Sequence, residues 1–206
     1  MRSDYSEVVC IHACADYTYD ALLECIREQF RLLHAEECIR PGMKVVLKPN
    51  LVVKAAPDSA VITHPLVTAA VAACVQELGG QVLVAESSGG LYTPAALKSI
   101  YAGSGYLEMA ERYGIELNYD CSSGDRKAPE GVRCKGFTVI RPVLDADAVV
   151  DICKLKSHCM TGLSGAVKNL FGVVPGLMKP ELHCRFPEKP QFGEMLADLC
   201  HTIRPV

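Results

Sequence analysis

The 206-residue sequence lacks several features that would assign it to a functional class at once. No apolar run approaches the roughly 18 residues that cross a bilayer, so we expect no membrane-spanning segment. The N-terminus has no charged region followed by an apolar one, as an export signal would, so we expect a cytoplasmic protein. The net charge of −3 argues against nucleic acid as the main partner.

Common motifs of nucleotide-binding and hydrolytic enzymes are also absent. There is no phosphate-binding loop of the form G-x-x-x-x-G-K-[ST], and residues 103–108 depart from the dinucleotide fingerprint at its final glycine. Neither G-x-S-x-G nor H-E-x-x-H occurs. The function must therefore rest on a different arrangement of residues.

The eleven cysteines include no C-x-x-C pair. Iron–sulfur clusters of the ferredoxin type need the tight C-x2-C-x2-C spacing, so we expect this chain alone to hold no cofactor and to supply no metal ligands. Cys25, Cys74 and Cys200 stand among apolar residues at helical spacing, which is typical of small buried thiols in a reduced cell.

Apolar runs alternate with segments of helical periodicity, which predicts an α/β fold: a mostly parallel open sheet with helices on both faces. The expected strands are Glu7–Ala13, Met43–Leu47, Gln81–Ala85, Ile115–Asn118 and Ala148–Cys153. The expected helices are Tyr19–Leu33, His64–Leu78 with Thr63 as N-cap, Pro94–Tyr101, Tyr106–Tyr113, Gly162–Phe171 and Gln191–Ile203. We expect a surface loop over residues 121–131 and a hairpin or edge strands over Val132–Val143.

We expect residues 1–206 to form a single α/β domain. The sequence stops just after a helix, where an α/β pattern would supply a further strand. We therefore expect an incomplete domain, the N-terminal portion of a longer protein.

The segment from Lys154 to Lys179 contains four lysines and one histidine but no Asp or Glu. It is also rich in Gly, Ser and Thr, which expose backbone N–H groups, and its charges are interleaved with apolar residues. Lysines beside such a backbone form sites for phosphates and carboxylates. We expect Lys168 to be partly buried with no local carboxylate, so that an anionic small-molecule ligand would complete it.

Polar residues follow three of the expected strands directly. Because ligands gather at the carboxyl ends of parallel strands, we expect these loops to form one crevice. The predicted ligand-binding residues are Lys48, Asn50, Ser87, Ser88, Gly89, Gly90, Lys156 and Asn169.

Two histidines are candidate acid/base residues beside Lys168. His158 is close in sequence to Lys156 and Lys168, whose charges would lower its pKa and favour the neutral imidazole. His183 could close over the same crevice. The predicted catalytic residues are His158, Lys168 and His183.

Two motifs, VVLKPNLV (Val45–Val52) and KLKSHCMTGLSGAVKNLFGVVPG (Lys154–Gly176), resemble the signatures of the family called domain of unknown function 362. Loop 86–90 is similar to that family's Gly-rich loop. Members are often described as iron–sulfur, metal-binding proteins, because many carry a ferredoxin-like module after this domain. The resemblance implies a 4Fe-4S cluster in a full-length protein, and a fold that continues beyond residue 206.

The chain is also distantly similar to the N-terminal domain of nickel-dependent lactate racemase. In that enzyme a lysine holds a nickel-pincer nucleotide and histidines move protons. The matching lysine here would be Lys168, and the matching histidines would be His158 and His183. Ala166-Val167 stands where a second glycine would help the cofactor approach. We take this similarity as an indication of where the site lies.

Three functions stay open at this point, and so does the question of whether the domain is an enzyme. The first is binding of an anionic small molecule within a redox-associated, iron–sulfur-type protein. The second is a racemase-like or isomerase-like enzyme with His158 and His183 as acid and base. The third is a non-catalytic scaffold that docks a C-terminal ferredoxin module or another electron-transfer partner.

Overall fold

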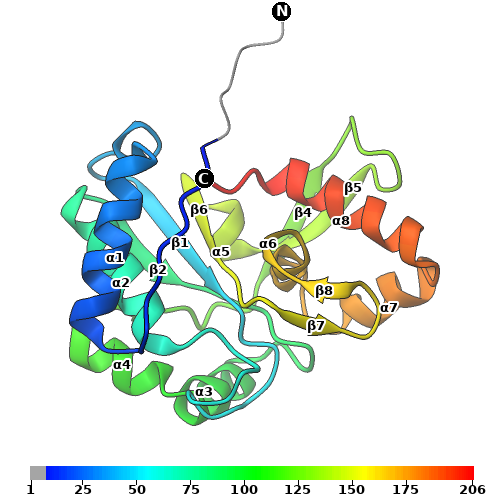
Figure 1. The fold of residues 1–206 in the computed structure, drawn as a ribbon. Helices are drawn as coiled ribbons and strands as arrows, with labels where there is room; N and C mark the ends of the chain where they lie inside the picture. Colours follow the sequence, from blue (N-terminus) through cyan, green and yellow to red (C-terminus); the bar gives the residue numbers. More distant parts are fainter. Residues whose placement is uncertain (1–7) are drawn as a thin grey trace, which may run out of the picture.

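The strands predicted from apolar runs form a parallel sheet. A computed structural model describes residues 8–206 and shows four parallel strands in the order β3-β2-β1-β6, with helices on both faces (Figure 1). The strands are β1 (Lys44–Pro49), β2 (Gln81–Val84), β3 (Glu116–Leu117) and β6 (Ala148–Ile152). Val46 of β1 pairs with Leu83 on one side and Val149 on the other. The predicted α/β class is confirmed.

Alternate side chains of the strands enter two separate cores. Val45 and Leu47 of β1 pack on one face of the sheet, whereas Val46 packs on the other. The first face is covered by α1 (Tyr19–Leu32), α2 (Pro65–Glu77), α3 (Pro94–Gly103) and α4 (Tyr106–Tyr113), and η1 (Ala35–Glu37) follows α1. The second face is covered by α5 (Arg141–Leu144), α6 (Ala166–Asn169), η2 (Leu170–Val173), α7 (Met178–Arg185) and α8 (Lys189–Ile203). Burial on both faces explains why the strands are continuous apolar runs.

The N-cap of α2 differs from the prediction. His64 is the capping residue, and its Nδ1 accepts the N–H of Leu66 at 3.2 Å. Thr63 instead joins two strand ends: its hydroxyl donates to Ile152 O at 2.7 Å and accepts from Asn50 N at 3.0 Å. The prediction was wrong because a long-range contact uses the Thr63 side chain.

Two further elements outside the main sheet were predicted wrongly. The described part of the expected first strand, residues 8–13, lies in no strand, and Val8, Val9 and Ile11 are exposed. Residues 121–131 contain β4 (Ser123–Lys127), which pairs antiparallel with β5 (Gly136–Ile140). The sequence of β4 is polar because its side chains are at most half-buried, so it carries no hydrophobic signal.

The expected helix Gly162–Phe171 begins as a strand instead. β7 (Lys156–His158) and β8 (Gly162–Ser164) form an antiparallel hairpin in which His158 pairs with Gly162. Gly162 adopts a φ of 75°, which suits the end of a tight turn and which other residues rarely adopt. Helical structure starts only at Ala166 and is divided between α6 and η2. Among the helices between residues 8 and 206, none combines the length and apolar character of a bilayer span.

Candidate anion-binding site

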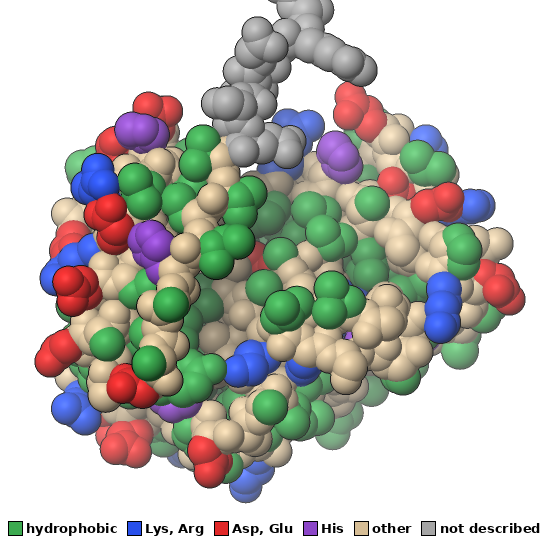
Figure 2. Space-filling model, viewed as in Figure 1, with side chains coloured by type: hydrophobic (Ala, Val, Ile, Leu, Met, Phe, Trp, Pro, Cys, Tyr) green, Lys and Arg blue, Asp and Glu red, His purple; other side chains and the backbone are tan. Residues whose placement is uncertain are grey.

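The order of the sheet reverses at β1. The strands that follow β1 in sequence, β2 and β3, lie on one side of it, whereas β6 lies on the other. In open α/β sheets, such a switch point leaves a ligand crevice outside the carboxyl ends of the two strands. A cavity of about 80 Å³ lies there. Figure 2 shows a hollow in the face of the molecule that it displays, with basic side chains at the lower edge of the hollow.

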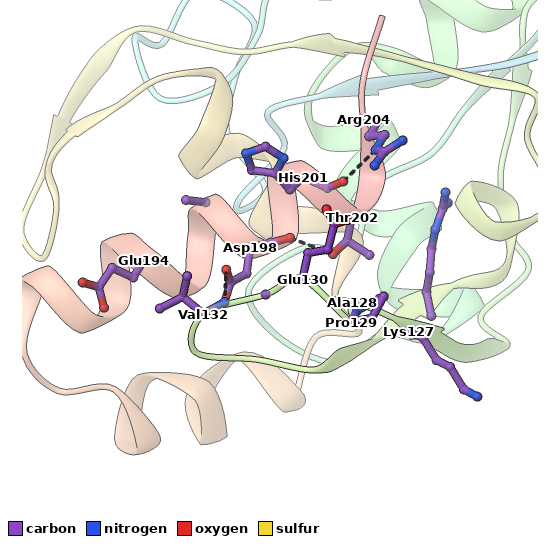
Figure 3. Close-up of a pocket in the computed structure, with 13 residues that line it drawn as sticks. Lys127, Ala128, Pro129, Glu130, Val132, Glu194, Asp198, His201, Thr202 and Arg204 are labelled. Atoms are coloured by element: carbon purple, nitrogen blue, oxygen red, sulfur yellow. Dashed lines mark hydrogen bonds between the residues drawn. The ribbon is translucent and has the colours of Figure 1, made fainter. Parts of the chain in front are cut away.

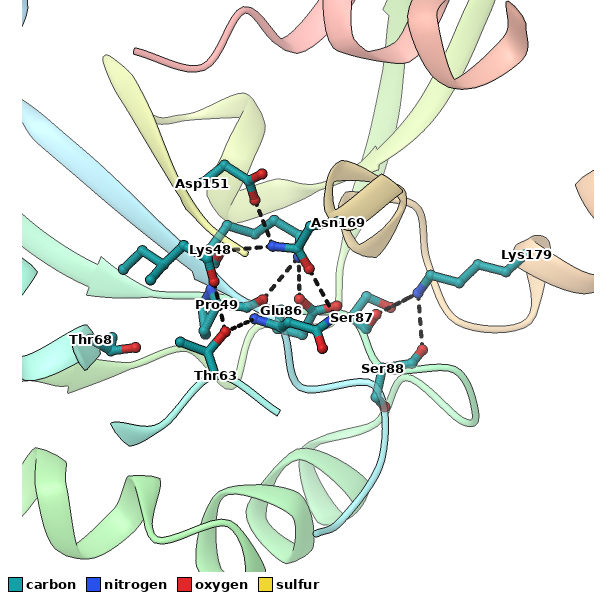
Figure 4. A network of polar contacts seen from close by, with 12 residues as sticks. Lys48, Pro49, Thr63, Thr68, Glu86, Ser87, Ser88, Asp151, Asn169 and Lys179 are labelled. Carbon is teal, nitrogen blue, oxygen red and sulfur yellow. Dashed lines mark hydrogen bonds and ion pairs between the residues drawn. The ribbon is translucent and has the colours of Figure 1, made fainter. Parts of the chain in front are cut away.

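The cavity brings together residues from all three predicted loops. Its lining includes six predicted site residues: Asn50, Gly89, Lys156, His158, Lys168 and Asn169. The adjoining polar network (Figure 4) adds Lys48, Ser87 and Ser88. Gly90 lies against Gly176, where a Cβ would meet Gly90 O at 1.9 Å. Segments 92 and 119 residues apart thus meet at one edge of the sheet.

A buried ion pair forms the floor of this site. The Lys48 ammonium donates to Glu86 and to Pro49 O, the latter at 2.9 Å, and both charged side chains are buried. The Glu86 carboxylate lies against the backbone of η2, where a Cβ on Gly172 would come within 2.1 Å of Glu86 Oε1. Only glycine fits at residue 172 with Glu86 in this position.

A chain of hydrogen bonds leads from Lys156 to Asp151, and Figure 4 shows its last bond, between Asn169 and Asp151. The Lys156 ammonium donates to Asn50 Oδ1 at 2.7 Å. Asn50 Nδ2 donates to Asn169 Oδ1 at 3.0 Å, and Asn169 Nδ2 donates to Asp151 Oδ1 at 2.6 Å. An ammonium can only donate and a carboxylate can only accept, so the two ends fix the orientation of both amides.

Asp151 projects from β6 opposite Lys48 of β1. Burial raises the pKa of Asp151 to about 6, although Lys48 acts in the opposite direction. Its second oxygen, Oδ2, is buried and has no hydrogen-bond partner among the described residues. Sequence reasoning missed Asp151, although an acid in the otherwise apolar run of β6 was a visible signal.

Lys179 closes the site from α7. Its buried ammonium donates to Ser87 O, to Ser87 Oγ at 3.3 Å and to Ser88 O at 3.0 Å. Burial lowers the pKa of Lys179 to about 7. The N–H of Ser87 donates to Gly172 O, and the N–H of Gly89 donates to Val52 O. These two N–H groups are therefore used by the backbone, and the 86–90 loop presents carbonyl groups to Lys179.

Lys168 differs from the other three lysines. The ammonium groups of Lys48, Lys156 and Lys179 all donate hydrogen bonds, whereas that of Lys168 donates none to the described part of the chain. It lies 4.9 Å from the centroid of the Phe171 ring. Burial, reinforced by the charge of Lys48, lowers the pKa of Lys168 to about 8. As predicted, Lys168 is partly buried.

Comparison with known proteins gives the family. The family described as "Domain of unknown function (DUF362)" matches residues 45–206. The chain belongs to the DUF362 family. The predicted resemblance to this family is thus confirmed, whereas the distant similarity to lactate racemase stays a prediction. The match spans every predicted site residue from Lys48 to His183.

A relative of this DUF362 chain is the thylakoid-associated protein sll1697 of Synechocystis sp. It is 35% identical over 170 residues, which are 81% of this chain and 50% of the relative. The chain therefore spans about half the length of that relative.

The two candidate histidines of the DUF362 chain have different positions. His158 lines the cavity, and its Nδ1 accepts the N–H groups of Met160 at 3.2 Å and Thr161 at 3.3 Å. Its proton is therefore on Nε2. His183 stacks on Phe192 with ring centroids 4.7 Å apart and does not line this cavity. Burial, followed by the charge of Lys168, lowers the pKa of both histidines.

The cysteines of the DUF362 chain are dispersed. Cys74 is buried, and Cys25 and Cys200 are partly buried. Burial raises the pKa of Cys74 to about 11, which keeps it a thiol. Between residues 8 and 206, no three or more His, Cys, Asp or Glu side chains are grouped so that they could hold a metal ion.

A larger hollow, of about 560 Å³, lies between the β4–β5 loop and α8 (Figure 3). The carboxylate of Asp198 in this hollow accepts the N–H groups of Val132, Arg133 and Cys134 at 2.6–2.9 Å. This acid therefore fixes the loop against α8. The smaller cavity, with its incompletely paired charges, is the better candidate for a functional site.

Proposed function

We propose that this domain binds a small anionic molecule, bearing a phosphate or a carboxylate, in the cavity beside Lys168. The observation that carries the proposal is that the Lys168 ammonium is partly buried and donates no hydrogen bond to residues 8–206. A charge removed from water is costly unless a partner satisfies it. An anion in the cavity would supply that partner.

The balance of charge around the cavity supports this function. Four lysines face two carboxylates, those of Glu86 and Asp151. Glu86 is paired with Lys48, and Asp151 is bound by Asn169. The lowered pKa values of Lys168 and Lys179 reflect burial in this positive environment. An anion would favour the protonated lysines and raise both pKa values.

A titration with inorganic phosphate, sulfate and acetate, followed by calorimetry, tests the proposal. The wild-type chain is expected to bind at least one of these anions, and Lys168→Ala is expected to bind none of them. Lys98→Ala is the matched control, because it removes one exposed lysine on α3, away from the cavity. If Lys168→Ala binds as tightly as the control, the proposal is wrong.

The wider setting is part of the same proposal. For a full-length protein we keep the expectation of a cytoplasmic, redox-associated role with a 4Fe-4S module or an electron-transfer partner. The relative sll1697 is named for its association with thylakoids. Iron analysis and anaerobic absorbance spectra of a full-length protein would test this expectation.

A racemase-like activity is supported less by the geometry. Two-base chemistry would place His158 and His183 on opposite faces of one substrate carbon. His158 lines the cavity, but His183 packs against Phe171 and Phe192 outside it. Anion binding therefore agrees better with the arrangement of these side chains.

A further inference from the structure

Lys168 has the surroundings of an amine nucleophile as well as those of an anion partner. Its Nζ lies over the face of Phe171 in a cavity that Lys156 and Lys179 also line, and it donates no hydrogen bond to residues 8–206. Burial and the charges of Lys48 and Lys156 disfavour its ammonium form more than the Phe171 ring favours it. Lysines become nucleophilic when an apolar pocket and a neighbouring cation disfavour the ammonium form. The other three lysines of the site differ because hydrogen bonds to oxygen atoms hold their ammonium groups.

We propose that the Lys168 amine condenses with the carbonyl carbon of a small 2-oxo acid to form an imine. This inference rests on the proposed function, because the acid's carboxylate is the anion that the cavity holds. The cavity of about 80 Å³ limits the reacting part of the ligand to a few heavy atoms. The carboxylate would remain close to Lys156, which lines the same cavity.

The groups of this site supply the amine and the proton that the condensation needs. The neutral Lys168 amine attacks the carbonyl carbon, and proton transfer from nitrogen to oxygen gives a carbinolamine. The Lys156 ammonium, whose pKa is lowered by burial, then gives a proton to the carbinolamine hydroxyl. Water leaves as the C=N bond forms, which yields an iminium at Lys168 and a neutral amine at Lys156. The iminium retains one positive charge beside the bound carboxylate, so the anion stays paired.

The supply of neutral amine supports this assignment. Before the acid binds, Lys168 has a pKa of about 8 and is unprotonated in roughly one molecule in four near pH 7.5. A lysine with the ordinary pKa of 10.5 is unprotonated in roughly one molecule in a thousand at the same pH. Even though a less basic amine is a weaker nucleophile, Lys168 should react at least about tenfold faster than an exposed lysine such as Lys98.

Reductive trapping tests the inference. The 206-residue chain is incubated with glyoxylate or pyruvate and sodium cyanoborohydride, and the adducts are located by peptide mass spectrometry. We expect one dominant adduct on Lys168, at least about tenfold above that on Lys98. Acetaldehyde, which lacks the carboxylate, should show a smaller preference for Lys168 than glyoxylate does, and inorganic phosphate should suppress the glyoxylate adduct. Lys168→Arg and Lys168→Met should both lose the dominant adduct, and circular dichroism checks that each variant is folded.

The outcomes separate the two proposals. If the wild-type chain binds phosphate but glyoxylate and pyruvate label Lys168 no faster than Lys98, imine formation is refuted and anion binding stands. If the wild-type chain binds no anion and shows no selective adduct, both proposals are wrong. A selective adduct at Lys156 or Lys179 would overturn the assignment of the nucleophile to Lys168.

Discussion

Replacing Lys168 with methionine should make the protein more stable at neutral pH and abolish the proposed binding of an anion. Methionine keeps much of the side-chain length but cannot carry a charge. A pKa lowered from the ordinary 10.5 to about 8 corresponds to about 3 kcal/mol of destabilisation by the charged form. Solvent screening of the partly exposed ammonium and loss of its contact with Phe171 reduce the expected gain to about 1–2 kcal/mol.

The pH dependence gives this prediction its sign. Below pH 8, the wild-type protein carries the charged lysine in both the folded and the unfolded state, and the folded state is penalised in full. Between about pH 8 and 10.5, the unfolded state binds more protons, so wild-type stability rises with pH. Above about 10.5 the lysine is neutral in both states, and the penalty disappears.

The assay is urea unfolding of both proteins without added anions, at about pH 7 and about pH 9.5. The advantage of Lys168→Met in the free energy of unfolding should be largest at the lower pH and fall by more than half at the higher one. Added phosphate should raise the stability of the wild type and leave the variant unchanged. The reasoning is wrong if the variant is less stable than the wild type at pH 7, or if its advantage in the free energy of unfolding is the same at both pH values. Either result would mean that the charge of Lys168 does not destabilise the folded state.

Three further predictions concern the same site. Glu86→Gln leaves a buried lysine without its carboxylate and should lower the free energy of unfolding by about 3–5 kcal/mol, whereas Glu77→Gln, in an exposed pair, should change little. Gly172→Ala places a Cβ 2.1 Å from Glu86 Oε1 and should cost about 1–3 kcal/mol in urea unfolding. Gly193→Ala meets open space within α8 and should instead stabilise by about 0.5–1 kcal/mol. Phosphate affinity, measured by calorimetry, should weaken as pH rises through about 8, because Lys168 loses its proton there; an affinity that is constant from pH 7 to 9 would contradict that role.

The class of fold and the position of the crevice could be predicted from the sequence. Strands buried on both faces must be apolar throughout, so β1, β2 and β6 were visible as short apolar runs. Because such strands run parallel, the polar residues after each of them meet at one edge. Asn50, Gly89 and Lys156 therefore line one cavity, as expected. The motifs at Val45–Val52 and Lys154–Gly176 also lie within the family match.

The tertiary structure decided which charges are paired. Glu86 neutralises Lys48 from 38 residues away, and Asn50 bonds to Asn169 from 119 residues away. No local pattern encodes such contacts, because burial and partner depend on how the loops pack after the sheet has formed. For the same reason, Lys179 satisfies the loop carbonyls of Ser87 and Ser88.

The same contrast applies to the local structure of the basic segment. Its composition predicted an anion site, but its apolar spacing also suggested a helix over Gly162–Phe171. A hairpin forms instead, because β7 and β8 pair with each other and Gly162 turns between them. The sequence by itself determined which residues reach the sheet edge, since that follows from strand order and periodicity. Only the packed structure decided that Lys168, among four lysines, has no hydrogen-bond acceptor in the described chain, because solvation and pairing are properties of the whole fold.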